Sequence, residues 1–198
     1  MRSLSVSLLL LLPLHAVTAQ WRLTLLHGSA SASGYSRDEG GTDHLAFLPD
    51  RPSSNVIVIG HDLGRTRISV ETRRTSADLT LRGPGTAIVT RRAMHAWGAA
   101  IEGTRRLVGA AGRPTLHAGL GLLVERWAFD LEANDARWRV AGRGAIEVGV
   151  PVTERWTGIV RGEVTVSPSV FSADELPEGY LRRMGWRRGL GLGAGWRF

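Results

Sequence analysis

The sequence predicts an all-β fold, an up-and-down antiparallel β-barrel, and two features of the chain lead to this prediction. Apolar and polar residues alternate with a period of two, which is the period of a strand with one apolar and one polar face. The alternating stretches are also long. Ordinary strands have about five or six residues, whereas several stretches here reach the roughly 9 to 11 residues that a tilted strand needs to cross a membrane. The 198 residues suffice for one domain with a buried core.

The clearest alternation runs from Arg137 to Val150. Its even positions begin with Trp138 and Val140 and are apolar or glycine, whereas charged residues such as Arg143 and Glu147 fall on odd positions. Similar patterns occur towards the C-terminus, and less regular ones occur earlier. We therefore expect eight strands, near residues 20–33, 55–62, 66–81, 93–106, 114–128, 137–150, 156–167 and 183–198.

The connections between these strands alternate in length. Short turns such as Leu63-Gly64-Arg65 and Pro151 to Arg155 alternate with longer loops, and the first long loop is expected near 34–54. An even number of strands places both termini at the end that carries the short turns. The stretch from 34 to 66 is the least regular part, and an extra hairpin there would give ten strands.

The first 19 residues have the pattern of a secretory signal peptide. Arg2 supplies a positive start, Leu4 to Leu14 is an apolar run, and the small residue Ala19 closes a typical cleavage site. The apolar run is too short for a membrane-spanning helix. We expect cleavage after Ala19, which leaves residues 20–198 as a single barrel domain.

The C-terminal residues resemble the terminal strand signal of Gram-negative outer-membrane β-barrels. In that family the barrel-assembly machinery reads a glycine followed by apolar or aromatic residues at the antepenultimate and last positions. Here the corresponding residues are Gly193, Trp196 and Phe198. One position departs from the family pattern, because Gly191 stands where a polar residue is usual. The whole chain resembles small OmpA- or OmpX-like barrels.

This resemblance implies a transmembrane barrel in the cell outer membrane, reached through the inner membrane by the cleaved signal. Periodicity alone leaves open which face of the strands points outward. In a membrane barrel the apolar face contacts lipid and the polar face lines the interior. The expected partners are outer-membrane lipids, lipopolysaccharide and the barrel-assembly machinery. Aromatic girdles at the two interfaces are expected from Trp21, Trp138, Trp156, Trp186, Trp196 and Phe198.

The interior of an eight-stranded barrel is only wide enough for its own side chains to fill it. Charges buried there must pair and form hydrogen bonds, because an unpaired buried charge is very unfavourable. The sequence therefore predicts a closed, salt-bridged lumen, and a narrow gated pore or a small anion site is the alternative. The predicted lumen network consists of Arg67, Glu71, Glu125, Arg139, Arg143, Glu147, Arg161, Glu163 and Arg187.

The sequence identifies no catalytic residue, no metal site and no cofactor. The chain has no Cys, which excludes disulfides and thiol chemistry, and its six His show no close metal-ligand spacing. All 25 basic residues are Arg against 18 acidic ones, a net charge of +7. Because these Arg alternate into strands and form no single patch, we expect no nucleic-acid binding.

The sequence favours a non-enzymatic barrel that serves envelope structure, surface interaction or restricted, porin-like transport. Two alternatives remain open at this stage. One is an outer-membrane enzyme that modifies lipid A. The other is a secreted soluble barrel that binds an apolar ligand, in which the face with Val140, Ile146 and Val148 would point inward.

Overall fold

The computed structural model describes residues 20–33, 36–38, 46–83, 86–110, 112–129, 136–174, 176 and 178–198. The expected signal peptide, residues 1–19, and its cleavage site at Ala19 lie outside the described residues. No helix among the described residues is long and apolar enough to cross a membrane.

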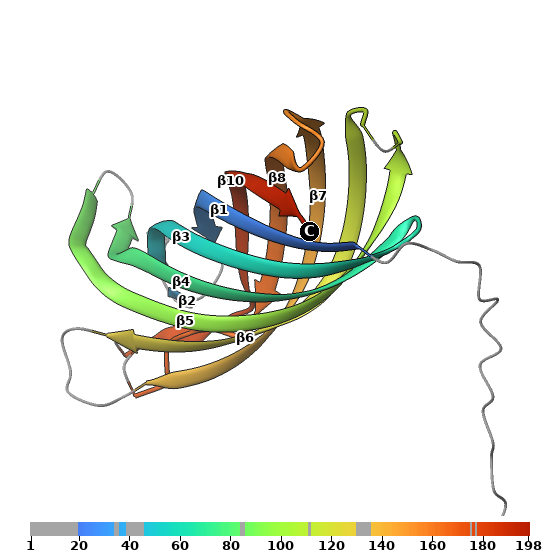
Figure 1. Ribbon diagram of the computed structural model, residues 1–198. Helices are drawn as coiled ribbons and strands as arrows, with labels where there is room; N and C mark the ends of the chain where they lie inside the picture. The colour runs from blue at the N-terminus through green and yellow to red at the C-terminus, as the bar shows by residue number, and fades with distance from the viewer. Residues whose placement is uncertain are drawn as a thin grey trace, which may run out of the picture.

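Eight long antiparallel strands form a closed ring (Figure 1). Each pairs with its neighbour along the chain, and β1 closes the ring by pairing with β10 as well as β3. Two three-residue strands, β2 (Ser36–Asp38) and β9 (Tyr180–Arg182), pair with each other beside β3. The up-and-down barrel of eight strands is thereby confirmed. The long strands are β1 (Gln20–Ser33), β3 (Ala46–Leu63), β4 (Thr66–Gly83), β5 (Thr86–Val108), β6 (Thr115–Phe129), β7 (Arg137–Pro151), β8 (Trp156–Ser167) and β10 (Gly185–Arg197).

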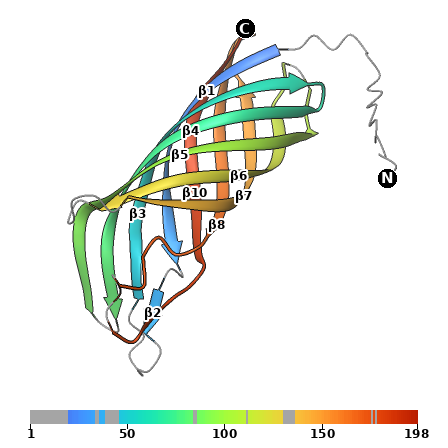
Figure 2. The ribbon, with the colours of Figure 1, turned by 90° about the horizontal axis from the view of Figure 1, so that it is seen from below.

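The two ends of the barrel differ in their connections (Figure 2). One end, here the turn end, carries the start of β1, the end of β10, the short turns at 64–65 and 152–155, and the connecting residues 109–110 and 112–114. Phe198 N donates a hydrogen bond to Trp21 O there, at 3.1 Å. The opposite end, here the loop end, carries β2, β9 and the connection from β8 to β10.

Two strands begin earlier than predicted. β3 begins at Ala46 and β5 at Thr86, so the expected first outer loop at 34–54 is partly strand. Both strands contain irregular pairing with β4, and the left-handed residues Arg51 (φ 47°) and Arg92 (φ 50°) lie at these points. At each β-bulge, β3 or β5 has more residues than the stretch of β4 with which it pairs. The bulges interrupted the alternation on which the predicted strand bounds depended.

Buried charged side chains gather inside the barrel, and large apolar side chains cover its outer wall. Outward residues of β7 such as Val140 and Ile146 are each 58 % exposed, whereas inward Glu71 and Glu125 are 1 % and 0 % exposed. Val148 also points outward. The apolar face therefore points away from the interior, which is opposite to the arrangement that a soluble barrel with an apolar ligand requires.

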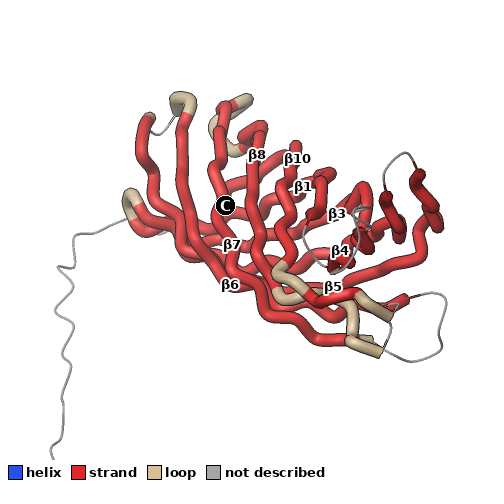
Figure 3. The backbone as a smooth tube through the Cα atoms, turned by 180° about the vertical axis from the view of Figure 1, so that it is seen from behind, coloured by secondary structure: helices blue, strands red, loops and turns tan. Residues whose placement is uncertain are grey.

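An apolar cluster fills the interior at the loop end. Part of it comes from the described part of the connection between β8 and β10, which supplies Val170, Phe171 and Leu176. The Phe171 ring lies 4.5 Å from the Phe47 ring and 5.8 Å from the Phe129 ring, between centroids. This connection is among the tan segments in Figure 3, where the strands are red. Side chains from the barrel wall complete the buried cluster: Leu48, Ala77, Leu79, Ala93, Met94, Ala96 and Trp127.

Candidate functional site

The interior charges come from strands whose alternate residues point inward. In a pleated strand, residues two apart share a face. Glu71 and Arg73 therefore lie on the inner face of β4, and Arg143 and Glu147 lie on that of β7. All four side chains are buried. The closed ring brings together residues that are far apart in the sequence.

Arg143 occupies the middle of the interior. Its Nη1 donates to Glu71 Oε1 at 2.6 Å, and its Nη2 donates to Glu102 Oε2 at 2.7 Å. Arg161 Nη2 donates to the same Glu102 oxygen at 2.5 Å. These contacts join β4, β5, β7 and β8 across the lumen. Two guanidinium groups on one carboxylate give charge-assisted hydrogen bonds, which are stronger than neutral ones.

A second ion pair links β4 to β8. Arg73 Nη1 and Nη2 donate to the two carboxylate oxygens of Glu163, each at 2.8 Å, and Arg73 Nε donates to Glu71 Oε1 at 2.8 Å. This two-bond arrangement fixes the orientation of both side chains. Through Glu71, it is connected to Arg143.

Towards the loop end, Arg187 of β10 forms a forked ion pair with Glu125 of β6. Trp127 Nε1 donates to Glu125 Oε2 at 3.2 Å, and the Arg187 guanidinium carbon lies 5.4 Å from the Trp127 ring centroid. The carboxylate is thus held by three donors. This pair adjoins the apolar cluster, of which Trp127 is a member.

Towards the turn end, Arg67 joins two carboxylates. Its Nε donates to Asp62 Oδ1 at 2.7 Å and its Nη1 donates to Glu147 Oε1 at 3.0 Å. Arg22 Nη1 lies 3.8 Å from Glu147 Oε1, and Arg161 Nη1 lies 3.7 Å from Glu147 Oε2. Glu147 therefore connects the turn-end group to the centre.

The described ion pairs of the interior balance in charge. Six arginines and six carboxylates take part, and this equality offsets the large penalty of burying each ion. The arginines are Arg22, Arg67, Arg73, Arg143, Arg161 and Arg187. The carboxylates are Asp62, Glu71, Glu102, Glu125, Glu147 and Glu163. We call these twelve side chains the interior network.

The structure brings most of the predicted lumen residues together. Arg67, Glu71, Glu125, Arg143, Glu147, Arg161, Glu163 and Arg187 all belong to the interior network. Arg139 lies apart from them: its Nε donates to Ser169 O at 2.6 Å and its Nη1 donates to Trp138 O at 2.9 Å, both near the loop end.

The prediction missed four members of the interior network: Arg22, Asp62, Arg73 and Glu102. Strand parity could have found them, because each lies on an inward position of a predicted strand. Arg73 follows Glu71 by two residues, so it shares the inner face of β4. Asp62 is the last residue of the predicted strand at 55–62 and directly precedes the predicted turn, so it was not assigned to the lumen.

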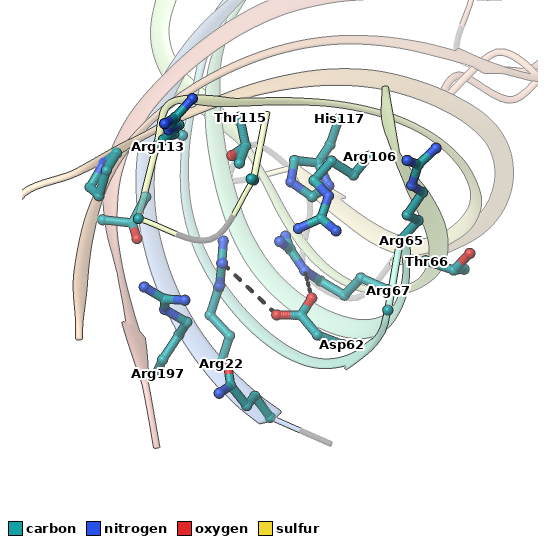
Figure 4. Close-up of a pocket in the computed structure, with 17 residues that line it drawn as sticks. Arg22, Asp62, Arg65, Thr66, Arg67, Arg106, Arg113, Thr115, His117 and Arg197 are labelled. Carbon is teal, nitrogen blue, oxygen red and sulfur yellow. Dashed lines mark hydrogen bonds and ion pairs between the residues drawn. The ribbon is translucent and has the colours of Figure 1, made fainter. Parts of the chain in front are cut away.

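A pocket of about 240 Å³ opens at the turn end. Arg22 and Arg67 point into it, close to Asp62, and Arg106, Arg113 and Arg197 also line it (Figure 4). The pocket is lined by Gln20, Arg22, Asp62, Gly64, Arg65, Thr66, Arg67, Arg106, Ala110, Gly112, Arg113, Thr115, His117, Gly149, Pro151, Thr157 and Arg197. Its lining holds six arginines and one carboxylate.

The three residues of the predicted assembly signal lie at the seam between β1 and β10 or next to it. Gly193 faces inward, and a Cβ placed on it would lie only 2.0 Å from Leu25 O. Trp196 and Phe198 lie on the outer face at the turn end, with ring centroids 4.9 Å apart. Phe198 is 61 % exposed.

The described residues include no group of three or more His, Cys, Asp or Glu side chains that could hold a metal ion. The clearest histidine contact is on the outer wall, where His27 Nδ1 lies 2.9 Å from Asn55 Oδ1. That pair joins β1 to β3.

No protein-family model and no curated protein sequence matches this chain. Solved structures do match. Neisserial surface protein A (NspA) is similar with a TM-score of 0.56 and 12% identity, over 92% of this chain and 98% of that chain. Ail, the attachment invasion locus protein of Yersinia pestis, crystallised with the heparin analogue sucrose octasulfate, is similar with a TM-score of 0.50 and 9% identity, over 91% of this chain and 99% of Ail. The chain therefore has the fold of small outer-membrane β-barrels, which confirms the resemblance at the level of the fold.

Proposed function

We propose that this chain is an integral outer-membrane barrel whose lumen is closed, and that it serves envelope structure or surface interaction. The main support for the proposal is the distribution of polar and apolar side chains over the two faces of the closed ring. Ionised side chains pair with one another inside it, and apolar side chains cover its outer wall. The fold shared with NspA and Ail supports the same location.

The outer wall supports a membrane environment. Its most exposed large apolar side chains, between 38 % (Val124) and 77 % (Leu120) exposed, occur on every long strand. Soluble monomers rarely expose contiguous apolar patches larger than a few hundred Å². Trp21, Trp156 and Phe198 near the turn end and Trp138 and Trp186 near the loop end are at least 46 % exposed, as expected of two aromatic girdles.

Two obstructions in series support a closed lumen. The interior network crosses the middle of the barrel, for example through the contacts of Arg143 with Glu71 and Glu102. The apolar cluster with Phe171 and Met94, both 0 % exposed, fills the interior at the loop end. An ion would have to displace both groups. We therefore favour a structural or surface role over open transport.

Export and assembly belong to the same proposal. Residues 1–19 would direct secretion and be removed after Ala19, and the barrel-assembly machinery would read Gly193, Trp196 and Phe198. Lipopolysaccharide would contact the outer wall near the loop end, where Arg139, Arg182 and Arg183 line an exposed hollow beside Trp138. Guanidinium groups bind phosphate in a two-bond geometry.

Conductance in planar lipid bilayers tests the closed lumen. We expect the inserted native chain to give no discrete current steps in either direction of voltage. Insertion is verified in parallel by heat-modifiable electrophoretic mobility of the same preparation. Regular single-channel steps from the inserted native chain would contradict the closed lumen and favour restricted transport.

A further inference from the structure

We propose that the turn-end pocket is a binding site for a small oxyanion, specifically a phosphate group. The pocket lies at the mouth of the barrel that also carries both described chain ends. This inference does not require the lumen to be closed, because the pocket opens outside the interior network's centre.

Buried donors without an acceptor point to a ligand. Arg22 and Arg67 are 8 % and 5 % exposed, and both line the pocket. Nε and Nη1 of Arg22 and Nη2 of Arg67 have no hydrogen-bond acceptor among the described residues. Leaving a buried donor unsatisfied costs about 1–3 kcal/mol, and more for a charged group. If the guanidinium groups turn towards the opening, an anion in the pocket would accept these hydrogen bonds.

The charge of the pocket also fits an anion. The interior network is neutral as a whole and already uses Arg22, Arg67 and Asp62. Arg65, Arg106, Arg113 and Arg197 are additional to it, and Asp62 is the one carboxylate among the residues that line the pocket. The mouth therefore carries four positive charges that the described lining does not offset.

The surroundings hold these arginines close to the opening. Arg106 N donates to Arg65 O at 2.7 Å, which ties the turn after β3 to the end of β5. Arg197 Nη2 donates to Glu154 O at 2.8 Å, which fixes one guanidinium edge beside the turn after β7. Figure 4 shows the side chains of Arg22, Arg106 and Arg197 on different sides of one opening. They come from three different strands, β1, β5 and β10.

Size and donor number select the class of ligand. The pocket, about 240 Å³, is smaller than the roughly 300–1,000 Å³ of pockets that hold drug-sized molecules. Several guanidinium groups lining one pocket match an anion with several acceptor oxygens, and arginine recognises phosphate in this way. A monocarboxylate has only two oxygens and one charge. A phosphate group, free or on a lipid headgroup, therefore fits best.

The test is calorimetric titration of inorganic phosphate into the purified chain in a non-ionic maltoside detergent at low salt and pH 7.5. We expect saturable binding that weakens as sodium chloride is added, because salt screens exposed charges. Acetate under the same conditions should bind at least about 10-fold more weakly, in line with its single charge and fewer acceptors.

Variants locate the site. Arg22→Gln should weaken phosphate binding about 10-fold or more, since one charge-assisted hydrogen bond is removed. Arg22 is buried, so a second variant covers the case in which this one does not fold: Arg106→Gln with Arg113→Gln changes two less buried lining residues. Arg105→Gln is the matched control, because Arg105 is the neighbour of Arg106 but is exposed and does not line the pocket.

A competition experiment with phosphatidylglycerol distinguishes a free phosphate from the phosphate of a lipid headgroup. If phosphatidylglycerol added to the micelles abolishes the phosphate titration, the site takes a lipid headgroup, and if it has no effect, the site takes a free phosphate. The proposal is overturned if phosphate does not bind saturably to the folded chain. It is equally overturned if Arg105→Gln weakens binding as much as the lining variants do.

Discussion

Arg187 and Arg188 show how strongly the position on a strand decides the role of a charge. They are adjacent in β10, yet Arg187 points inward and is paired with Glu125, whereas Arg188 points outward and is exposed. The same residue type is therefore a structural ion in one case and a surface group in the other. Strand parity, and not residue type, separates the two.

Replacing these two arginines separately tests the interior network. Arg187→Gln leaves Glu125 buried without its cation, which should lower the free energy of unfolding by about 3–5 kcal/mol. Arg188→Gln should change it by no more than about 0.5 kcal/mol. Urea unfolding followed by tryptophan fluorescence in lipid vesicles measures both. Adding Glu125→Gln to Arg187→Gln should recover part of the loss. Equal losses from the two single variants would argue against the network.

The sequence predicted that buried ion pairs would fill the lumen, but it predicted less well which residues belong to the interior network. Alternation placed Arg143 and Glu147 on one face of a strand, and the structure buries both. It did not indicate that Arg139, on the same face, lies too near the loop end to reach that group. Partners across the ring, such as Arg73 and Glu163, are separated by 90 residues. Only ring closure and strand register bring them together.

At the scale of elements, the seam between β1 and β10 depends on a close approach of two backbones. At Gly193 an added Cβ would lie 2.0 Å from Leu25 O, and at Gly191 the nearest atom would be 3.6 Å away. Both glycines belong to β10 and pair with β1. The first position tolerates no side chain without a shift of the seam, and the second does.

Gly193→Ala should therefore destabilise the barrel by about 1–3 kcal/mol, the usual penalty of overpacking. Gly191→Ala is the matched control and should be close to neutral. Refolding of the purified chain into detergent, scored by heat-modifiable mobility, measures this effect without the assembly machinery. If Gly193→Ala refolds as well as Gly191→Ala, the seam is not limited by this contact, and any defect in cells would come from the assembly signal.

The connection between β8 and β10 stabilises the loop end through its apolar residues. Phe171 is 0 % exposed and contacts Phe47 and Phe129. Phe171→Ala should lower the free energy of unfolding by about 3–5 kcal/mol, as large-to-small changes in a core do. Leu181→Ala in β9, where the leucine is 40 % exposed, is the control and should have a small effect. Thermal unfolding in detergent compares them, and similar melting temperatures would contradict a packed cluster.

Strand bounds were predicted well where alternation is unbroken and poorly where bulges occur. β8 runs over the predicted residues, 156–167. β3 and β5 begin before their predicted first residues, on the N-terminal side of the irregular pairings near Arg51 and Arg92. Extra residues in one strand break the regular alternation of inward and outward positions, so a period-two pattern ends there although the strand continues. The apolar cluster at the loop end was missed because it joins residues of several predicted strands to Leu48, in the extension of β3, and to Val170, Phe171 and Leu176 of a loop.

For the whole molecule, the fold decides which face of the strands points outward, and the sequence pattern does not. Alternation predicted one apolar and one charged face but left their direction open. A ring of eight strands has room inside only for its own side chains, and the structure places the charged ones there. The apolar residues are left on the outer wall, so the barrel needs an apolar solvent around it.

The outer-membrane location of the barrel is tested by cell fractionation and heat-modifiable mobility of the chain, expressed with residues 1–198 in a Gram-negative host. We predict that the chain is found in the outer-membrane fraction and that its electrophoretic band shifts on boiling. Deletion of Phe198 should reduce the shifted form in cells. A chain found in the soluble periplasm with no heat-dependent shift would contradict the account, because its outer wall would then face water.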